Sequence, residues 1–163
     1  MNMPLIKQPR LKMKRKHKRD VRTQFAALCY RMKGEKLQIM LITSRTRGRW
    51  ILPKGWPENG MTPTQAAAKE AYEEGGIKGI AYDMPLGLYS YSKAHGPFAG
   101  IPKIVMVFPV EVTKLSKSYP EKSQRQRKWF SPKAAAKRVE EPQLRKIIKS
   151  FDPSALQAPA KSA

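Results

Sequence analysis

The sequence predicts one domain of the α/β class in its α+β form, a mixed β-sheet packed between helices. A length of 163 residues with 40% hydrophobic residues is typical of a single globular domain with a real core. The expected elements follow one another as strands, a helix, further strands and two final helices. That order favours a layered sandwich over a regular βαβ alternation.

The first strands are predicted from apolar, β-compatible runs. Residues 24–30 and 37–43 are such runs, and the Lys-Gly-Glu stretch 33–35 between them is typical of a hairpin turn. Residues 50–52 form a short strand. The stretch 53–60 is rich in Pro and Gly, so we expect a loop without regular structure there.

A helix over 63–74 has a well-marked beginning and end. Thr62 is a suitable N-cap, Pro63 suits the first helical position, and Gln65 lies where a capping box needs Glu or Gln. The segment contains four alanines and three glutamates, and Gly75-Gly76 ends it.

The second half of the chain predicts more strands and two helices. Strands are expected at 82–92, 103–112 and 127–130. A helix begins at Ser131-Pro132 and runs to about residue 139. Another begins at Pro142 and carries one apolar stripe that docks on the sheet, formed by Leu144, Ile147, Ile148 and Phe151.

Charge is the unusual property of the composition. Thirty-three Lys and Arg against twelve Asp and Glu leave a net charge of +21, which attracts polyanions such as nucleic acid or phosphorylated metabolites. Residues 1–20 are predicted to be a basic, disordered arm, 21–152 the domain, and 153–163 a frayed tail. We interpret the arm as a solvated tail, with an RNA-binding patch as the alternative.

Several classes of protein are excluded. Cys29 is the single cysteine, so neither a disulfide framework nor a multi-cysteine zinc site is available. No apolar run approaches the roughly 20 residues of a membrane span, and the N-terminus does not read as a secretory signal. We therefore expect a cytoplasmic protein without a membrane partner.

Three carboxylates share one face of the helix predicted at 63–74. Glu70, Glu73 and Glu74 stand at i, i+3 and i+4, so their charges repel unless a cation compensates them. Mg²⁺ prefers such oxygen ligands and often bridges carboxylates to substrate phosphates. A solvated acidic helix face is the alternative.

The surroundings of these glutamates favour the metal site. The chain resembles the Nudix hydrolase superfamily, whose box reads G-x5-E-x7-R-E-U-x-E-E-x-G-U with U apolar. The matching positions are Gly55, Glu70, Ala71, Glu73, Glu74, Gly76 and Ile77. The resemblance covers about residues 21–151 and implies a Nudix-type α/β/α sandwich with a mixed sheet.

Two positions depart from the box. Met61 stands where the early Glu belongs, and Lys69 stands where Arg belongs. In the family these two residues often brace the loop against the helix. We expect the brace to be lost here and the metal-binding face to be kept. Glu58 is acidic but out of register, so it is given no role.

The flanking residues narrow the resemblance to one branch. Thr43-Ser44-Arg45, Arg49-Trp50 and the basic strand ending in Trp129-Phe130 look most like the diphosphoinositol polyphosphate phosphohydrolases, a branch that also cleaves diadenosine polyphosphates. The resemblance thus implies Mg²⁺-dependent hydrolysis of a phosphoanhydride bond in a highly phosphorylated small molecule.

The resemblance also implies roles for individual residues. Glu70, Glu73 and Glu74 would hold Mg²⁺, with Mn²⁺ as the alternative metal. Glu73 and Glu74 would be the main ligands, and Glu70 would ligate or orient the attacking water. Glu121 is the candidate proton acceptor on a later loop, with Glu111 second.

Substrate phosphates need cations and polar contacts. The candidates are Ser44, Arg45, Arg49, Lys54, Gly55 and Arg127. If Arg125 and Arg127 alternate on a strand, only one of them reaches the cleft. A basic surface loop is the alternative for the arginines, and a role for Arg47 is left open.

Two other functions stay open at this point. The basic arm could hold RNA while the box acts on a 5′ end or cap. The departures at Met61 and Lys69 could instead mark a binding module on the same fold that has lost its activity.

Overall fold

The computed structural model describes residues 22–93, 95–96 and 99–156. The predicted basic arm, residues 1–20, and the end of the predicted tail, residues 157–163, lie outside the described residues. The first part of that tail forms a short 3₁₀ turn, η1 (Pro153–Ala155), which follows the last helix.

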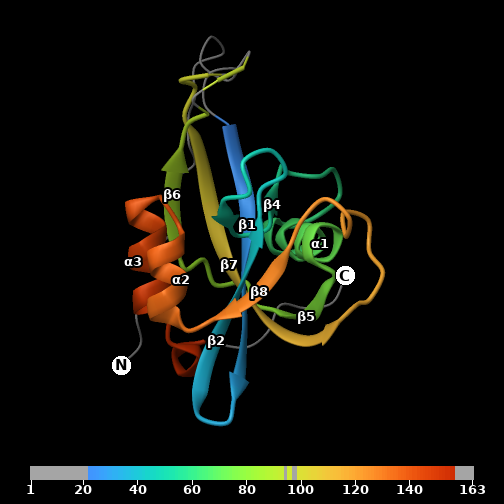
Figure 1. The fold of residues 1–163 in the computed structure, drawn as a ribbon, viewed down its shortest axis with the longest axis vertical. Coiled ribbons are helices and arrows are strands. Elements are labelled where there is room, and N and C mark those ends of the chain that lie inside the picture. The colour runs from blue at the N-terminus through green and yellow to red at the C-terminus, as the bar shows by residue number, and fades with distance from the viewer. Residues whose placement is uncertain (1–21, 94, 97–98, 157–163) are drawn as a thin grey trace.

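A mixed sheet forms the centre of the described domain (Figure 1). Its central order is β3-β2-β1-β7-β5, with β4 on β1, β6 on β7 and β8 on β2. Only β1 and β7 pair in parallel among the described strands. The bounds are β1 (Arg22–Lys33), β2 (Lys36–Thr43), β3 (Trp50–Ile51), β4 (Lys54–Gly55), β5 (Ile77–Ala81), β6 (Gly87–Tyr91), β7 (Lys103–Leu115) and β8 (Arg127–Phe130).

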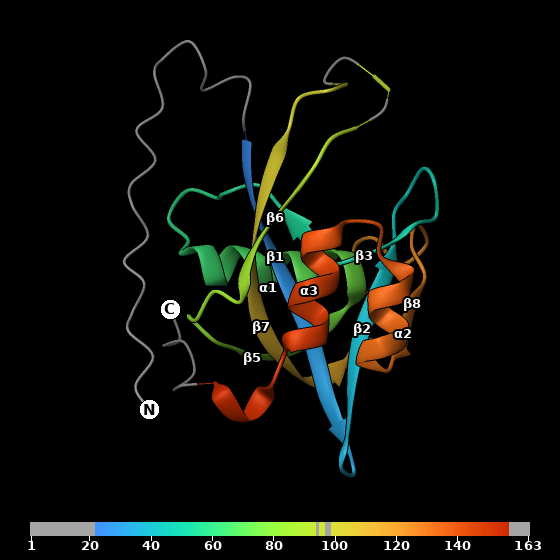
Figure 2. The same cartoon turned by 90° about the vertical axis from the view of Figure 1, so that its left-hand side faces the viewer.

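Helices cover both faces of this sheet. Helix α1 (Pro63–Gly75) lies on one face, and α2 (Pro132–Arg138) and α3 (Pro142–Ser150) lie together on the other (Figures 1 and 2). The predicted sandwich is therefore confirmed. No helix in the described part of the chain is long and apolar enough to span a membrane.

Alternation along β1 divides the interior into two cores. Ala26, Leu28 and Tyr30 pack toward α2 and α3, whereas Ala27 and Cys29 pack toward α1. The predicted apolar stripe of α3 belongs to the first core. Cys29 is fully buried, and burial raises the pKa of its thiol, so it behaves as a small apolar side chain.

Helix α1 begins and ends where the sequence predicts. The Thr62 hydroxyl accepts a hydrogen bond from the Gln65 backbone N–H at 3.2 Å, and the Gln65 side chain accepts one from the Thr62 N–H at 3.0 Å. Gly76 ends the helix with φ of 63°, a left-handed conformation that suits glycine.

The loop predicted at 53–60 contains a short strand instead. In β4, Lys54 and Gly55 pair antiparallel with Ala26 and Phe25 of β1. Such a two-residue strand between proline and glycine residues gives no periodic signal, because its pairing with β1 depends on a distant part of the chain. This pairing is what holds the loop against the sheet.

The strand predicted at 82–92 is also different in the structure. The chain forms β5 before this range and β6 near its end, and both pair with β7. Pro85 lies between them and interrupts the pairing, since proline lacks the N–H that a ladder needs. Gly79 lies at the register shift in β5, which weakened the strand signal there.

Candidate active site

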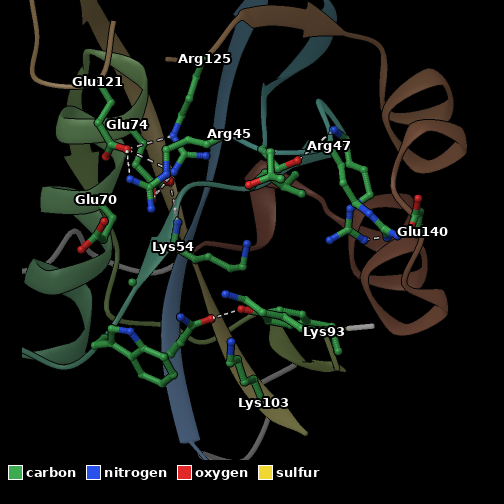
Figure 3. Close-up of a pocket in the computed structure, with 18 of the residues that line it drawn as sticks. Arg45, Arg47, Lys54, Glu70, Glu74, Lys93, Lys103, Glu121, Arg125 and Glu140 are labelled. Atoms are coloured by element: carbon green, nitrogen blue, oxygen red, sulfur yellow. Dashed lines mark hydrogen bonds and ion pairs between the residues drawn. The ribbon is translucent and has the colours of Figure 1, made fainter. Parts of the chain in front are cut away.

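A cleft of about 950 Å³ opens where β4 crosses the end of α1 (Figure 3). Its described lining is strongly charged and of mixed sign. The acids are Glu58, Glu70, Glu74, Glu121 and Glu140. The arginines and lysines are Arg45, Arg47, Arg49, Lys54, Lys93, Lys103 and Arg125.

Gly55 brings β4 directly onto the acidic face of α1. A Cβ at this position would overlap the Glu70 carboxylate, so any larger residue would force the Glu70 side chain to move. Gly55 lines the cleft. The contact with Glu70 explains its place in the motif independently of any contact with substrate.

Glu74 is the buried acid of the cleft, with 7% of its surface exposed. One carboxylate oxygen accepts a hydrogen bond from the Lys54 backbone N–H at 3.2 Å, and the other lies 3.4 Å from an Arg125 terminal nitrogen. Burial raises the pKa of Glu74 to about 7, although Arg125 and Lys54 oppose this effect.

Glu70 is half-buried beside Glu74. Burial raises the pKa of Glu70 to about 7, and the charges of Glu74 and Glu73 add to the effect. No hydrogen bond or ion pair from another described residue reaches its carboxylate. Two crowded carboxylates with incomplete protein neutralisation are chemically suited to a hard divalent cation.

The Glu73 side chain is positioned differently from those of Glu70 and Glu74. Its carboxylate is 3.4 Å from the Lys69 ammonium, and it does not line the cleft. Across the described residues, no three His, Cys, Asp or Glu side chains converge as a ready-made cation site. A single ion shared by Glu70, Glu73 and Glu74 therefore requires the Glu73 side chain to leave Lys69.

The sequence predicts that the brace between the loop and the helix is lost. The structure contains such a brace, but its acid comes from another position of the loop. The Lys69 ammonium lies 2.5 and 2.6 Å from the two carboxylate oxygens of Glu58, and this contact raises the pKa of Lys69. The acid comes from position 58 instead of 61, where Met61 is exposed. Glu58, to which the sequence assigns no role, ties the loop to α1.

Glu121 reaches the acid end of the cleft from the loop before β8. Its carboxylate accepts hydrogen bonds from Arg125 at 3.3 Å and lies 3.7 Å from Arg45. Its backbone N–H donates to the Glu73 carbonyl at 3.0 Å, which fixes the loop to the helix. Glu111, the second candidate, accepts from the Tyr82 hydroxyl and does not line the cleft.

The arginine loop between β2 and β3 also lines the cleft, from Arg45 near Glu121 to Arg47 on the side of Glu140 (Figure 3). The Ser44 hydroxyl accepts a hydrogen bond from the Arg49 N–H at 3.0 Å, which closes the loop. The Arg49 side chain lies 2.8 Å from Glu140, and its buried Nε has no hydrogen-bond partner among the described residues. Ser44, Arg45 and Arg49 all line the cleft.

Of the two arginines near β8, Arg125 is the one in the cleft. Arg127 donates instead to the Gly75 carbonyl at 2.7 Å and the Ser116 carbonyl at 3.0 Å, beyond the end of α1. The structure therefore places Arg127, a predicted substrate contact, outside the cleft lining. Its position indicates that it holds the helix terminus.

Two lysines in the cleft lining have no counterpart in the sequence prediction, Lys93 and Lys103. Lys103 is 6% exposed, in phase with the buried Val105 and Val107 of β7. A lysine at a position where the alternation of the strand expects an apolar residue was the signal that could have identified Lys103. Lys54 is half-buried, and its partial desolvation lowers its pKa to about 8.

The fold and the cleft together define a class of protein. In this class a mixed sheet lies between helices, and carboxylates of one helix face a cleft rich in lysine and arginine. The NUDIX domain family model matches residues 21–151, so the chain belongs to the NUDIX family. It is 31% identical over 120 residues to "Nudix hydrolase 12, mitochondrial" of Arabidopsis thaliana, covering 71% of this chain and 59% of that protein.

Other similarities agree with this assignment. Mouse "Diphosphoinositol polyphosphate phosphohydrolase 3-alpha" is 32% identical over 116 residues, covering 69% of this chain and 65% of that protein. The crystal structure of Caenorhabditis elegans Ap4A hydrolase has the same fold, with a TM-score of 0.60 and 20% identity, over 79% of this chain and 94% of that one. The chain spans about half to two thirds of the length of the first curated relatives.

The raised pKa of Glu70 predicts that this carboxylate destabilises the metal-free fold. Because the pKa of Glu70 is higher in the fold than in the unfolded chain, stability falls as pH rises from about 4.5 to 7. In metal-free buffer at pH 8, Glu70→Gln should raise the melting temperature by about 2–4 °C, allowing for solvent screening of a half-buried group.

At pH 4, where Glu70 is mostly protonated in both states, the same substitution should change the melting temperature little. Melting by circular dichroism in chelator at the two pH values measures the difference. Equal shifts at both pH values would show that the charge of Glu70 is not the cause.

The pairing of Glu58 with Lys69 predicts that a carboxylate introduced at position 61 can replace the carboxylate of Glu58. Glu58→Gln should lower kcat/KM about tenfold, because the support of the acidic helix is lost. Adding Met61→Glu restores a carboxylate at the family position opposite Lys69, so the double variant should recover most of the rate. Steady-state assays on one phosphoanhydride substrate compare the two variants and Met61→Glu alone, which should differ little from wild type. A double variant as slow as Glu58→Gln would contradict the brace.

Proposed function

We propose that this protein is a Mg²⁺-dependent pyrophosphohydrolase that cleaves a phosphoanhydride bond in a highly phosphorylated small molecule. One observation carries the proposal: two helix carboxylates, the half-buried Glu70 and the buried Glu74, face a cleft lined by seven arginines and lysines among the described residues. Anionic ligands for metal and cationic ligands for phosphate are what such a reaction requires. Diphosphoinositol polyphosphates and diadenosine polyphosphates are the favoured substrates, in line with the names of the relatives.

The metal fits the acid end of the cleft. Glu70 and Glu74 would hold it, and Glu73 would join them on leaving Lys69. When bound, Mg²⁺ neutralises phosphate charge and lowers the pKa of a coordinated water. Mn²⁺ suits the same oxygen ligands.

The remaining residues bind and orient the substrate. Arg45 is 62% exposed in its side chain and reaches across the cleft mouth, so it can exchange its contact with Glu121 for a substrate phosphate. Arg125 is 7% exposed and held by Glu74 and Glu121, so it acts as a fixed positive charge. Lys54 contributes a half-buried side chain to the cleft lining.

The reaction consumes one water molecule for each bond cleaved. The water oxygen forms a bond to one phosphorus, and the bridging oxygen leaves with the electron pair of the broken P–O bond. Glu121 is the proposed proton acceptor, because it lies in the cleft next to Arg45 and Arg125. Arg125 fixes the position of the Glu121 carboxylate in the cleft, and the proton that Glu121 accepts then passes to solvent or to the leaving phosphate.

Two expectations from the sequence stay predictions. An RNA substrate depends on the arm at residues 1–20, which lies outside the described residues. A cytoplasmic location is proposed from the sequence, although some relatives carry mitochondrial names. Deleting residues 1–19 separates the substrates: turnover of small polyphosphates should survive, and salt-dependent RNA affinity should fall if the arm holds RNA.

A substrate panel tests the proposed function. The protein is incubated with Mg²⁺ and a diphosphoinositol polyphosphate, diadenosine tetraphosphate, ADP-ribose or a capped RNA, and the products are resolved by anion exchange. We expect consumption of the first two to be fastest. Absence of hydrolysis on every substrate with both Mg²⁺ and Mn²⁺ would instead establish a binding module.

The metal assignment predicts the effect of neutralising single carboxylates. Glu73→Gln and Glu74→Gln should each lower kcat about 100-fold or more, as loss of preorganised charge stabilisation does, while the fold persists. Glu35→Gln, in the exposed turn between β1 and β2, is the matched control and should keep the wild-type rate. Near-normal turnover by Glu73→Gln would remove that residue from the metal site.

A further inference from the structure

The loop between β7 and β8, residues 116–126, is attached to the end of helix α1 (Figure 1). At the start of the loop, the Ser116 backbone N–H donates to the Gly76 carbonyl at 2.7 Å. In its middle, the Glu121 backbone N–H donates to the Glu73 carbonyl at 3.0 Å. The last carbonyls of a helix have no partner within the helix, so the loop supplies donors that α1 needs. The helix that carries the acidic face therefore also holds the loop that carries Glu121.

Arg127 ties the two ends of this loop together. Its backbone pairs with Ile42 of β2, and its side chain reaches back to the start of the loop. One terminal nitrogen donates to the Gly75 carbonyl at 2.7 Å, and the other donates to the Ser116 carbonyl at 3.0 Å. The planar guanidinium thus connects the sheet, the loop and the helix in one fixed geometry.

The end of α1 is shaped to receive this guanidinium. Arg127 lies over the ring of Tyr119, a residue of the same loop, at 4.9 Å from the ring centroid. A Cβ at Gly76 would overlap both the Tyr119 ring and the Arg127 guanidinium, so this approach requires glycine. The last turn of α1 contains no lysine or arginine of its own. Arg127 therefore also supplies the positive charge that the C-terminal end of a helix dipole favours.

Glu121 lies between this attachment and the cleft. Its carboxylate is 3.3 Å from Arg125, which in turn is 3.4 Å from Glu74 (Figure 3). The position of the Glu121 carboxylate relative to the acidic face thus depends on where the backbone of the loop is held. Arg127 does not line the cleft, so its route to the reacting groups is through the loop.

We propose that Arg127 is a positioning residue for catalysis, which holds the loop against the end of α1 and so places the Glu121 carboxylate beside the acidic face. This inference rests on the proposed function, in which Glu121 accepts the proton of the attacking water. Misplacement of a reacting group by about 1 Å can lower a rate about 100-fold, so the attachment of the loop matters for turnover.

A double-mutant cycle between Arg127 and Glu121 tests this role, with diadenosine tetraphosphate and Mg²⁺. Arg127→Gln should lower kcat about 30-fold and leave KM nearly unchanged, because the cations that line the cleft are kept. Glu121→Gln should lower kcat about 100-fold. The double variant should be no slower than Glu121→Gln, since Arg127 acts through that carboxylate. If Arg127→Gln lowers kcat by the same factor with and without Glu121, the proposal is overturned.

Arg31→Gln is the matched control. Arg31 is half-buried like Arg127 and also lies over an aromatic ring, at 4.1 Å from the Trp129 ring centroid, but it does not line the cleft. Its substitution removes the same charge and a similar contact, so Arg31→Gln should keep the wild-type kcat. A loss equal to that of Arg127→Gln would indicate a general effect of stability and would overturn the proposal. Melting by circular dichroism checks the fold, and Arg127→Lys takes the place of Arg127→Gln in the cycle if that variant unfolds.

Amide hydrogen exchange, measured by NMR without substrate, separates this inference from the proposed function. In Arg127→Gln the N–H groups of Ser116 and Glu121 should exchange at least about tenfold faster than in wild type, with those of β1 unchanged. If wild-type protein hydrolyses no phosphoanhydride, the proposed function fails, and faster exchange still establishes that Arg127 holds the loop. If hydrolysis occurs and exchange at these two amides is unchanged, the inference is wrong and the function stands.

Discussion

The site depends on the close approach of strand β4 to helix α1 at Gly55. This glycine leaves room for the Glu70 carboxylate. The backbone N–H of the preceding residue, Lys54, donates a hydrogen bond to Glu74. One short strand thereby places the half-buried Lys54 beside the half-buried Glu70 and the buried Glu74. Without that contact, the acidic face of α1 would be an ordinary solvated helix surface, and its charges would be screened by water.

The charges of the cleft are unfavourable for the stability of the fold. In a protein with a net charge of +21, burial still raises the pKa of Glu70 and Glu74 to about 7, and it lowers the pKa of Lys54 to about 8. Buried charges of this kind cost free energy unless bound partners compensate them. Their concentration in one cleft is typical of functional sites, where charged groups are kept at some expense of stability.

Local signals predicted much of this structure. The capping box at Thr62, the left-handed Gly76 and the apolar stripe of α3 each follow from rules that act within a few residues, and all are confirmed. The spacing of Glu70 and Glu74 likewise placed them on one helix face. Strand β4 was missed because its pairing with β1 is tertiary.

The remaining differences also arise from contacts between distant parts of the chain. Whether Arg125 or Arg127 enters the cleft depends on how β8 meets the end of α1, which no local pattern records. The pairing of Glu58 with Lys69 depends on the path of a loop, so the motif alone indicated a lost brace.

Anomalous diffraction from crystals soaked in Mn²⁺ tests the central claim most directly, that the acidic face of α1 is a cation site. The predicted result is a strong peak about 2.0–2.6 Å from oxygens of Glu70 and Glu74, with Glu73 turned away from Lys69 to join them. A saturating soak that leaves Glu73 on Lys69 and shows no peak near these carboxylates would contradict the claim.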